Sequence, residues 1–189
     1  MKLESGNNGS VITHHGVTPK IHPSVFMAEG VRIIGDVEIG ENVSIWYNTV
    51  IRGDVNYIRI GANTNIQDLS MLHVTNKKWP LILEDNVSVG HSVSLHGCIL
   101  KPYCLIGIGA IVLDGATVGE QSLVAAGALV REGFVVPPRT LVAGVPAKVI
   151  RELSDEDLKR ITDTPGNYIA YVADYRKEYT NYLNNLNTI

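Results

Sequence analysis

Three histidines of this chain, His73, His91 and His96, have the spacing expected of metal ligands in a repetitive fold. His73 and His96 each directly follow a leucine, Leu72 and Leu95, and His91 stands two residues after another aliphatic position. Neutral imidazole binds zinc at about 2.1 Å, and a catalytic zinc site typically has three protein ligands and one open position. The chemistry to expect is activation of a water molecule, provided that the fold brings the three imidazoles together.

The fold that must position them is indicated by a strict six-residue repeat. Its aliphatic positions are Leu100, Ile106, Val112, Val118, Val124, Val130, Val136 and Val142. Mostly small residues follow four positions after the first seven of these: Cys104, Ala110, Ala116, Ser122, Ala128, Phe134 and Thr140. A period of six fits neither a helix nor an alternating strand. It predicts a parallel β-helix, in which short strands form flat faces and each coil stacks on the one before.

The same register, read backwards, predicts which residues are neighbours on adjacent coils. With three faces per coil, and loops inserted at the corners between Ile51 and Ile60 and between Leu72 and Leu83, the aliphatic residues form three columns. These are Ile39, Ile60 and Leu83 on the first face, Ile45, Ile66 and Val89 on the second, and Ile51, Leu72 and Leu95 on the third. Stacked strands lie about 4.8 Å apart.

This register places His73 beside His96 on the third face, with Arg52 on the neighbouring coil. His91 leaves from the second face and cannot readily converge with the other two in the same chain. In a threefold assembly, the third face of one subunit meets the second face of the next. We therefore expect a three-histidine site at each subunit interface.

Polar residues crowd the same region: Arg52, Asp54, Asn65, Gln67 and Asp68. Gln67 lies on the second face, at the offset next to that of His91, where its amide is expected to orient a metal-bound water. Arg52 and Asp54 are interpreted as a structural pair, either a corner cap or an intersubunit salt bridge.

Other residues whose side chains can bind a metal, the two cysteines and the remaining histidines, are interpreted as structural. Cys104 takes a small inward position of the repeat, which favours a buried thiol, and Cys98 is more readily explained by packing than by an approach to the metal. With only two cysteines, a disulfide framework is not expected. The histidines that precede the regular coil are interpreted as surface or hydrogen-bonded residues: His14, His15 and His22.

Length and composition suit one globular core. The chain has 189 residues, of which 45% are hydrophobic, and a formal net charge of -3. It has no basic stripe typical of nucleic-acid binding and no apolar run typical of a membrane span or a secretory signal. Neither a nucleic-acid nor a membrane partner is therefore expected, and the cytoplasm is the predicted location. The predicted organisation is an N-terminal segment 1–16, a β-helix domain 17–150 and a C-terminal helical segment 151–189.

The C-terminal segment predicts two helices packed on the coil, within an otherwise all-β fold. Ser154, with an acid three residues later at Asp157, indicates a helix start. The run 164–166, Thr-Pro-Gly, is expected to end this helix. A second amphipathic helix is predicted from residues that recur at helical spacing: Ile169, Val172, Tyr175, Tyr179 and Leu183.

The motifs around the histidines closely resemble those of the gamma-class carbonic anhydrases, over about residues 17–175. The motifs are Arg52-Gly53-Asp54, Asn65-Ile66-Gln67-Asp68, His73, Gly90-His91 and Leu95-His96-Gly97-Cys98. The resemblance implies a left-handed parallel β-helix and a homotrimer with a metal between subunits. It implies that His73, His91 and His96 match the metal ligands, that Gln67 matches a water-orienting residue, and that Arg52 and Asp54 match an interfacial pair.

The family chemistry that this resemblance implies is the reversible hydration of carbon dioxide to bicarbonate. The metal would be zinc (Zn2+), ferrous iron (Fe2+) or cobalt (Co2+), which lowers the pKa of its bound water from 15.7 to about 7 and so supplies hydroxide at neutral pH. The sequence departs from the best-characterised members where they carry glutamates, having Lys77 and Lys78 in the loop after the first histidine and Val55 after Asp54. Related short-loop homologues carry a tyrosine near the metal, which Tyr171 matches best.

Two other functions stay open from the sequence. Hexapeptide-repeat coils commonly serve acyltransferases that use acyl-coenzyme A, and residues 144–151 resemble a segment shared with those enzymes. Alternatively, the chain is a metal-binding homologue with little or no hydratase activity. Three histidines in metal register favour the hydratase over the acyltransferase.

Overall fold

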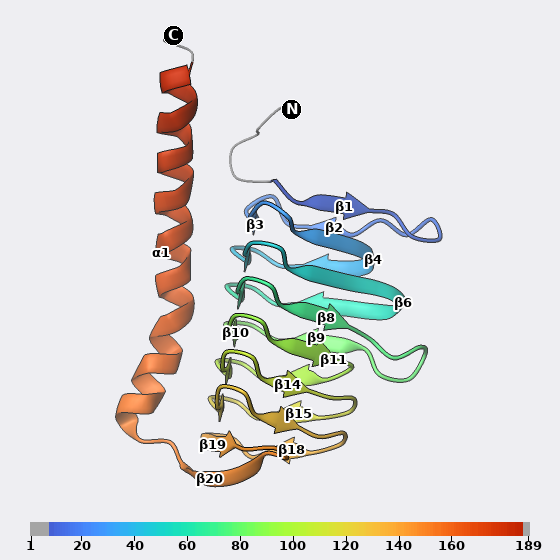
Figure 1. Cartoon of the computed structure of the whole chain (residues 1–189), viewed down its shortest axis with the longest axis vertical. Helices are drawn as coiled ribbons and strands as arrows, with labels where there is room; N and C mark the ends of the chain where they lie inside the picture. The colour runs from blue at the N-terminus through green and yellow to red at the C-terminus, as the bar shows by residue number, and fades with distance from the viewer. Residues whose placement is uncertain (1–7, 187–189) are drawn as a thin grey trace.

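The structure, a computed structural model, describes residues 8–186 and the side chains up to residue 178. Short strands stack along one axis into a parallel β-helix, and one long helix, α1 (Asp155–Leu186), runs beside this described part of the coil (Figure 1). One sheet has eight strands: β3 (Phe26–Met27), β5 (Ser44–Ile45), β7 (Asn65–Ile66), β10 (Ser88–Val89), β13 (Leu105–Ile106), β16 (Leu123–Val124), β19 (Thr140–Ala143) and β20 (Lys148–Glu152). The other has twelve: β1 (Ser10–Ile12), β2 (Lys20–Ile21), β4 (Arg32–Ile39), β6 (Val50–Ile60), β8 (Met71–His73), β9 (Leu81–Leu83), β11 (Ser94–His96), β12 (Ile99–Leu100), β14 (Ile111–Val112), β15 (Thr117–Val118), β17 (Leu129–Val130) and β18 (Val135–Val136).

The three aliphatic columns predicted from the repeat are confirmed. The paired residues are Ile39, Ile60 and Leu83 on the first face, Ile45, Ile66 and Val89 on the second, and Ile51, Leu72 and Leu95 on the third. All of these side chains are at most 4% exposed. Full burial of one such side chain contributes about 1.5–3 kcal/mol. The register of the coil is therefore held by its core, because a slip by one residue would turn each column outward.

The expected loop between Ile51 and Ile60 is instead part of a strand. β6 pairs with β8 through its first residues and with β9 through its last, so it carries the chain around the corner without interruption. Gly35 of β4 permits this path, since its φ is +76° and a Cβ there would lie 2.3 Å from the carbonyl oxygen of Gly53. The predicted insertion is present, because the pairing of β4 with β6 shifts by three residues at the corner, from Gly35–Gly53 to Val37–Ile58. It forms an irregularity within one strand rather than a separate loop.

The second insertion is a loop, as predicted. Thr75 and Trp79 form an isolated antiparallel bridge in which the Thr75 amide donates to the Trp79 carbonyl at 3.0 Å. The loop therefore folds back on itself between β8 and β9, at the same corner that β6 rounds one coil earlier.

The C-terminal segment forms one continuous helix rather than two. Its start is confirmed: the Asp157 amide donates to Ser154 Oγ at 3.2 Å and the Ser154 amide donates to Asp157 Oδ2 at 3.1 Å, a reciprocal capping box. The predicted break at 164–166 was wrong, because Pro165 lies inside the helix. A proline removes one backbone hydrogen bond at a cost of about 3 kcal/mol. Apolar packing on both sides of Pro165 offsets this cost.

α1 packs on the second face of the coil. Before Pro165, Leu158 and Ile161 pack with Leu123, and after it Tyr168 and Val172 pack against a cluster of Phe26, Ala28 and Trp46. Tyr175 also contacts this cluster, with its ring centroid 5.1 Å from that of Trp46, whereas Ile169 is 40% exposed and does not belong to the packed face. The side chains of Tyr179 and Leu183 lie outside the described residues.

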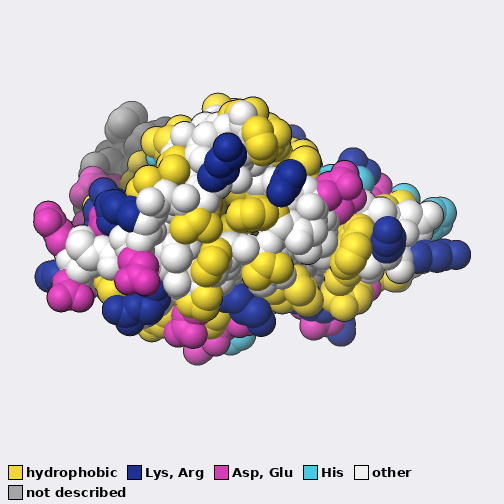
Figure 2. All heavy atoms as spheres, turned by 90° about the horizontal axis from the view of Figure 1, so that it is seen from below, with side chains coloured by type: hydrophobic (Ala, Val, Ile, Leu, Met, Phe, Trp, Pro, Cys, Tyr) yellow, Lys and Arg dark blue, Asp and Glu magenta, His cyan; other side chains and the backbone are white. Residues whose placement is uncertain are grey.

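The two ends of the coil differ. At the first end, β1 pairs in parallel with β4, so the ladder includes residues that precede the expected domain start at residue 17. At the other end, β20 pairs antiparallel with β19, and exposed apolar side chains gather there between scattered charges (Figure 2), among them Val135, Val149 and Ile150. Within the described range, no helix combines the length and apolarity needed to cross a membrane.

Candidate metal centre

His73 and His96 lie side by side on the third face. They are paired residues of the parallel strands β8 and β11, so their side chains leave adjacent coils in the same direction. His73 Nδ1 lies 3.1 Å from His96 Nε2, and the ring centroids are 5.0 Å apart. The stacking predicted from the register is therefore confirmed.

Each of the three candidate histidines contacts its own aspartate. His73 Nε2 lies 3.0 Å from Asp54 Oδ1, and His96 Nδ1 lies 2.6 Å from Asp114 Oδ1. A third such contact is made by His91, whose Nδ1 lies 2.7 Å from Asp68 Oδ2. Because an ionised carboxylate can only accept, each aspartate selects the histidine tautomer with its proton on the contacting nitrogen.

Two of these aspartates are held in the ionised form. Partial burial raises the pKa of Asp54, but hydrogen bonds from Arg52 and His73 outweigh it and hold the pKa below its usual value. Burial also raises the pKa of Asp114, and hydrogen bonds from Thr75 and His96 again lower it below the usual value. Both carboxylates therefore stay charged at neutral pH.

These protonation states leave two lone pairs facing each other. With a proton on His73 Nε2 and another on His96 Nδ1, the nitrogens that face each other at 3.1 Å are both acceptors. Two acceptors at this distance require a shared cation, either a proton or a metal ion. Two nitrogens bound at about 2.1 Å to a tetrahedral zinc ion are about 3.4 Å apart, so this pair fits a metal with little movement.

His91 does not join the pair within one chain. Among residues 8–186, no group of three histidine, cysteine, aspartate or glutamate side chains is placed to hold a metal ion. His91 instead lies at the corner after the second face, with a half-exposed side chain bonded to Asp68. One chain thus presents a histidine pair and a separate histidine.

The surroundings of His91 are aromatic. A pocket of about 220 Å³ is lined by Trp46, Tyr47, Asp68, His91, Tyr168, Tyr171 and Tyr175. Tyr171, predicted to lie near the metal, is therefore in the same pocket as His91, and its side chain is half exposed. Burial, assisted by the charge of Asp68, raises the pKa of the neighbouring Tyr168 to about 12. This pocket belongs to α1 and the second face together.

Gln67 is buried beside this corner and is held by a chain of amides. Its Nε2 donates to Asn65 Oδ1 at 3.2 Å, and Asn65 Nδ2 in turn donates to Ser88 Oγ at 2.8 Å. The backbone oxygen of Gln67 accepts from Thr49 Oγ1 at 3.1 Å, whereas its side-chain Oε1 has no hydrogen-bond partner within the described part of the chain. The Gln67 amide is therefore held in one orientation by its neighbours.

Arg52 and Asp54 form an ion pair within the chain, through Arg52 Nη1 and Asp54 Oδ2. Because Asp54 also contacts His73, the ion pair connects β6 to the histidine pair on the following coils. Asp54 also lines a pocket of about 250 Å³ together with His14 and His15.

Sequence reasoning missed Asp114 and Thr75. Asp114 follows Val112 by two residues, and Val112 pairs with Leu95, so the register alone places Asp114 on the coil next to His96. The signal was therefore present, but the position lies beyond the recognised motifs. Asp68, by contrast, was recognised as part of the polar region without a specific role.

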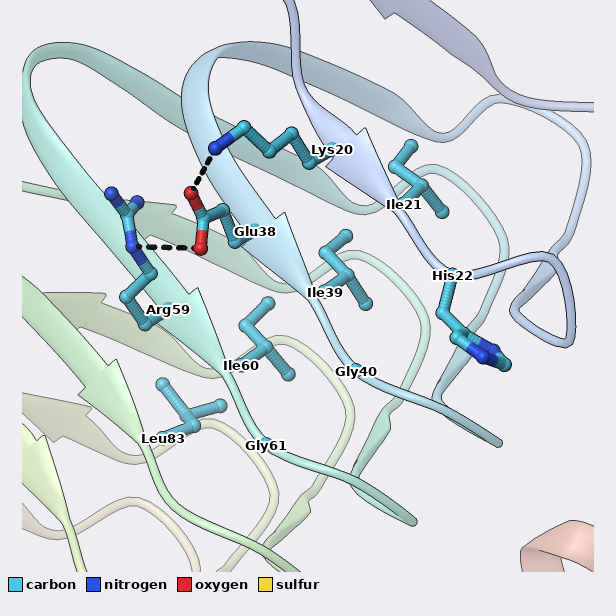
Figure 3. A pocket seen from close by; sticks show the side chains of 10 residues that line it. All are labelled: Lys20, Ile21, His22, Glu38, Ile39, Gly40, Arg59, Ile60, Gly61 and Leu83. Atoms are coloured by element: carbon cyan, nitrogen blue, oxygen red, sulfur yellow. Dashed lines mark hydrogen bonds and ion pairs between the residues drawn. The ribbon is translucent and has the colours of Figure 1, made fainter.

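The remaining candidates are structural. Cys98 and Cys104 are buried in the hydrophobic core, as their structural interpretation predicts, and burial raises the pKa of both thiols. A larger pocket of about 560 Å³ on the first face includes His22 (Figure 3). Its charged residues are paired with one another, Lys20 with Glu38 and Arg59 with Glu38, and it lies away from the histidine pair.

Known proteins share this sequence and fold. Residues 18–53 match the family described as bacterial transferase hexapeptide (six repeats). A carbonic anhydrase of Geobacillus kaustophilus is 51% identical over 166 residues, covering 88% of this chain and 91% of that protein. The mitochondrial gamma carbonic anhydrase 2 of Arabidopsis thaliana is 43% identical over 85% of this chain, which spans 60% of that longer protein.

Among solved structures, a putative acetyltransferase of Bacillus cereus has a TM-score of 0.88 and 47% sequence identity, covering 90% of this chain and 99% of that one. The identities to proteins named carbonic anhydrase extend over most of the chain and include the coils that carry the histidine pair. This chain is a member of the gamma carbonic anhydrase family.

Proposed function

We propose that this chain catalyses the reversible hydration of carbon dioxide to bicarbonate at a metal ion shared between subunits of a homotrimer. The observation that carries the proposal is the pair of facing acceptor nitrogens, His73 Nδ1 and His96 Nε2, 3.1 Å apart. His91 of the partner subunit would supply the third ligand. A divalent cation bound there, zinc or alternatively ferrous iron or cobalt, supplies hydroxide at neutral pH by lowering the pKa of coordinated water to about 7.

The surface next to the histidine pair supports a subunit contact. Met71 and Ile111 belong to the same outward column of the third face, and both are 39% exposed. Leu69 and Ile108, at the neighbouring corners, are 62% and 58% exposed. Exposed apolar side chains that adjoin an incomplete polar site are typical of a protein interface.

The helix restricts where the partner subunit can bind. α1 already covers much of the second face, so an approaching third face would meet its partner at the corner that carries His91. The proposed contact on the partner subunit is therefore this corner rather than the whole second face. Such a contact would close the pocket around Tyr171 and exclude bulk water from it.

Within the proposed site, the chain's own residues have separate tasks. Asp54, Asp68 and Asp114 fix the tautomers of the three histidines. Gln67, held by Asn65, would orient the water that reacts with carbon dioxide. Tyr171, which lines the pocket with His91, would contact the same solvent.

The proposal is tested by metal analysis combined with stopped-flow hydration of carbon dioxide. We expect about one metal ion per chain and measurable hydration with zinc, or with iron under anaerobic conditions. His73→Ala should lose both, while His22→Ala, a histidine distant from the pair, should lose neither. A trimer that binds metal but has no measurable rate with zinc or iron would refute the hydratase.

Acyl transfer is the competing function, because the similar Bacillus cereus structure is described as a putative acetyltransferase. Acyl-coenzyme A binding distinguishes the two. Metal-free protein that binds acetyl-coenzyme A and transfers its acyl group would favour this alternative. We expect no saturable binding of the thioester.

A further inference from the structure

Asp114 is bonded on both of its oxygens. Oδ1 lies 2.6 Å from His96 Nδ1, and Oδ2 accepts from Thr75 Oγ1 at 2.6 Å. Thr75 lies on the loop between β8 and β9, while Asp114 follows β14, so residues from separate coils meet here. Only 22% of the Asp114 side chain is exposed. The carboxylate therefore has a single orientation, fixed on one side by the loop and on the other by the histidine.

Two glycines make room for this arrangement. Gly97, directly after His96, has φ +53°, and a Cβ there would lie 2.3 Å from Asp114 Oδ1 and 2.7 Å from the Trp79 Cβ. Gly115, directly after Asp114, has φ +68°, and its Cβ would lie 3.1 Å from the Trp79 ring. Trp79 thus packs on the backbone of both residues.

The loop is therefore connected to the histidine pair through Asp114, which bonds to both Thr75 and His96. Its two bridge residues act together, since Thr75 donates to Asp114 while Trp79 packs over the glycines beside it. Lys78 lies over Trp79, with its Nζ 5.2 Å from the ring centroid, so this lysine packs on the tryptophan.

We propose that Asp114 is a positioning residue for the metal, and that the loop from Thr75 to Trp79 exists in this chain to hold Asp114 against His96. This inference rests on the proposed metal site. A carboxylate on the far nitrogen of a ligating histidine fixes the ring orientation and raises the basicity of the coordinating nitrogen, and loss of such a partner typically weakens metal binding by 10–100-fold. Asp114 would act only through His96 and would not touch the metal or the substrate.

The inference also accounts for the composition of this loop. The sequence lacks glutamates there and has Lys77 and Lys78 instead. A loop whose role is to hold an aspartate has no requirement for an acidic side chain of its own. It requires a hydroxyl at position 75 and a large flat ring at position 79.

The first test measures the His96 tautomer in the metal-free protein, using ¹⁵N-labelled histidine and NMR at about pH 8. We expect a protonated Nδ1 on His96 in the wild type. In Asp114→Ala we expect the proton to move toward Nε2, the commoner site in a free imidazole. A wild-type His96 with its proton on Nε2 would overturn the inference, whether or not the protein hydrates carbon dioxide.

The second test measures the dissociation constant for zinc by chelator competition on the assembled protein. Asp114→Ala should raise the constant by about 10–100-fold. Asp114→Asn keeps an acceptor without the charge and should lie between that variant and wild type. Thr75→Val, which removes only the hydroxyl, should weaken binding by less than Asp114→Ala, and Thr75→Ser should restore it.

A matched control is Glu38→Gln, because Glu38 is a paired carboxylate on the first face, away from the histidine pair. It changes the net charge by the same amount and should leave zinc affinity unchanged. Equal affinities for wild type and Asp114→Ala would overturn the positioning role. Weak zinc binding by the wild type itself would instead contradict the proposed function, and the tautomer measurement would still decide the role of Asp114.

Discussion

His73 Nδ1 and His96 Nε2 face each other at 3.1 Å, while the opposite nitrogen of each ring contacts a charged carboxylate. This relationship follows directly from the pairing of β8 with β11, because residues at the same register of parallel strands project alike. The two facing lone pairs can therefore bind one shared cation. Within one chain, a zinc site built on this pair would be short of one ligand.

Subunit complementation tests whether the site is shared. A His91→Ala chain mixed with a His73→Ala/His96→Ala chain should recover hydration that neither has alone, because each mixed trimer contains one interface with all three histidines. Random mixing in equal amounts should restore about one quarter of the wild-type sites, since three quarters of the trimers are mixed and each has one intact site in three.

The control for complementation uses two copies of the same defect. His73→Ala mixed with His96→Ala should recover nothing, because both substitutions damage the same part of the site. Recovery in this control, or absence of recovery in the first mixture despite exchange of subunits, would contradict the shared site.

Metal binding should stabilise the folded protein. Adding zinc at about 100 times its dissociation constant should contribute about 2.7 kcal/mol to the free energy of unfolding, because the proposed site would exist only in the folded trimer. Differential scanning calorimetry should show a higher Tm with zinc than after chelation. In His73→Ala the two Tm values should coincide, and a zinc-dependent increase there would indicate a different site.

Stability should fall at high pH through Tyr168. Its folded pKa is raised to about 12 by burial, whereas an unfolded tyrosine has a pKa near 10. The contribution is therefore fully present below about pH 10 and is lost as the pH rises toward 12. The Tm of the wild type should decline more steeply over this window than that of Tyr168→Phe, and parallel declines would contradict this assignment.

The start of α1 should depend on its capping box. Ser154→Ala should destabilise the protein by about 1 kcal/mol, because the Asp157 amide loses its side-chain acceptor. Hydrogen bonds from Arg151 and Ser154 hold the pKa of Asp157 well below its usual value. Its contribution is present above about pH 4 and is lost as the pH falls further.

The acid dependence has its own comparison. Asp157→Asn should show a smaller loss of Tm than wild type when the pH is lowered from about 5 toward 2. Thermal unfolding followed by circular dichroism measures both effects, and identical acid profiles would show that Asp157 is not responsible.

The corner rounded by β6 should be intolerant of side chains. Gly35→Ala combines a positive φ with a Cβ only 2.3 Å from the Gly53 carbonyl oxygen. A left-handed conformation alone costs a non-glycine residue about 1–2 kcal/mol, and the backbone contact adds to this. Gly166→Ala, where a Cβ meets nothing within 4 Å, is the comparison and should be neutral or slightly stabilising.

The sequence was sufficient to predict the coil because its period has a direct physical meaning. A large aliphatic residue at every sixth position must be buried, so Leu72 and Leu95 had to stack, and the histidines that follow them had to stack with them. The position of His91 outside the pair followed from the same reasoning. The register also places Asp114 on the coil next to His96, but nothing in the local sequence marks Asp114 as a site residue.

The corners and the helix were harder to predict because they depend on contacts far apart in sequence. The run between Ile51 and Ile60 looks like a loop, but β6 absorbs its three extra residues as a shift in its pairing with β4. Pro165 has a strong local tendency to end a helix, which is overcome by packing of Ile161 and Tyr168 on different coils. In both cases tertiary contacts outweighed a local signal.

α1 contacts parts of the coil that lie far apart along its axis. Near its end, Arg176 Nη2 donates to the carbonyl oxygens of Ser24 and Val25 on the first coils, while Leu158 packs at the last ones. A solenoid held only by neighbouring repeats can fray from either end independently. Because α1 contacts both ends of the coil, unfolding of one end disrupts helix contacts at the other. This protein should therefore unfold as one cooperative unit, although its coils are repeats.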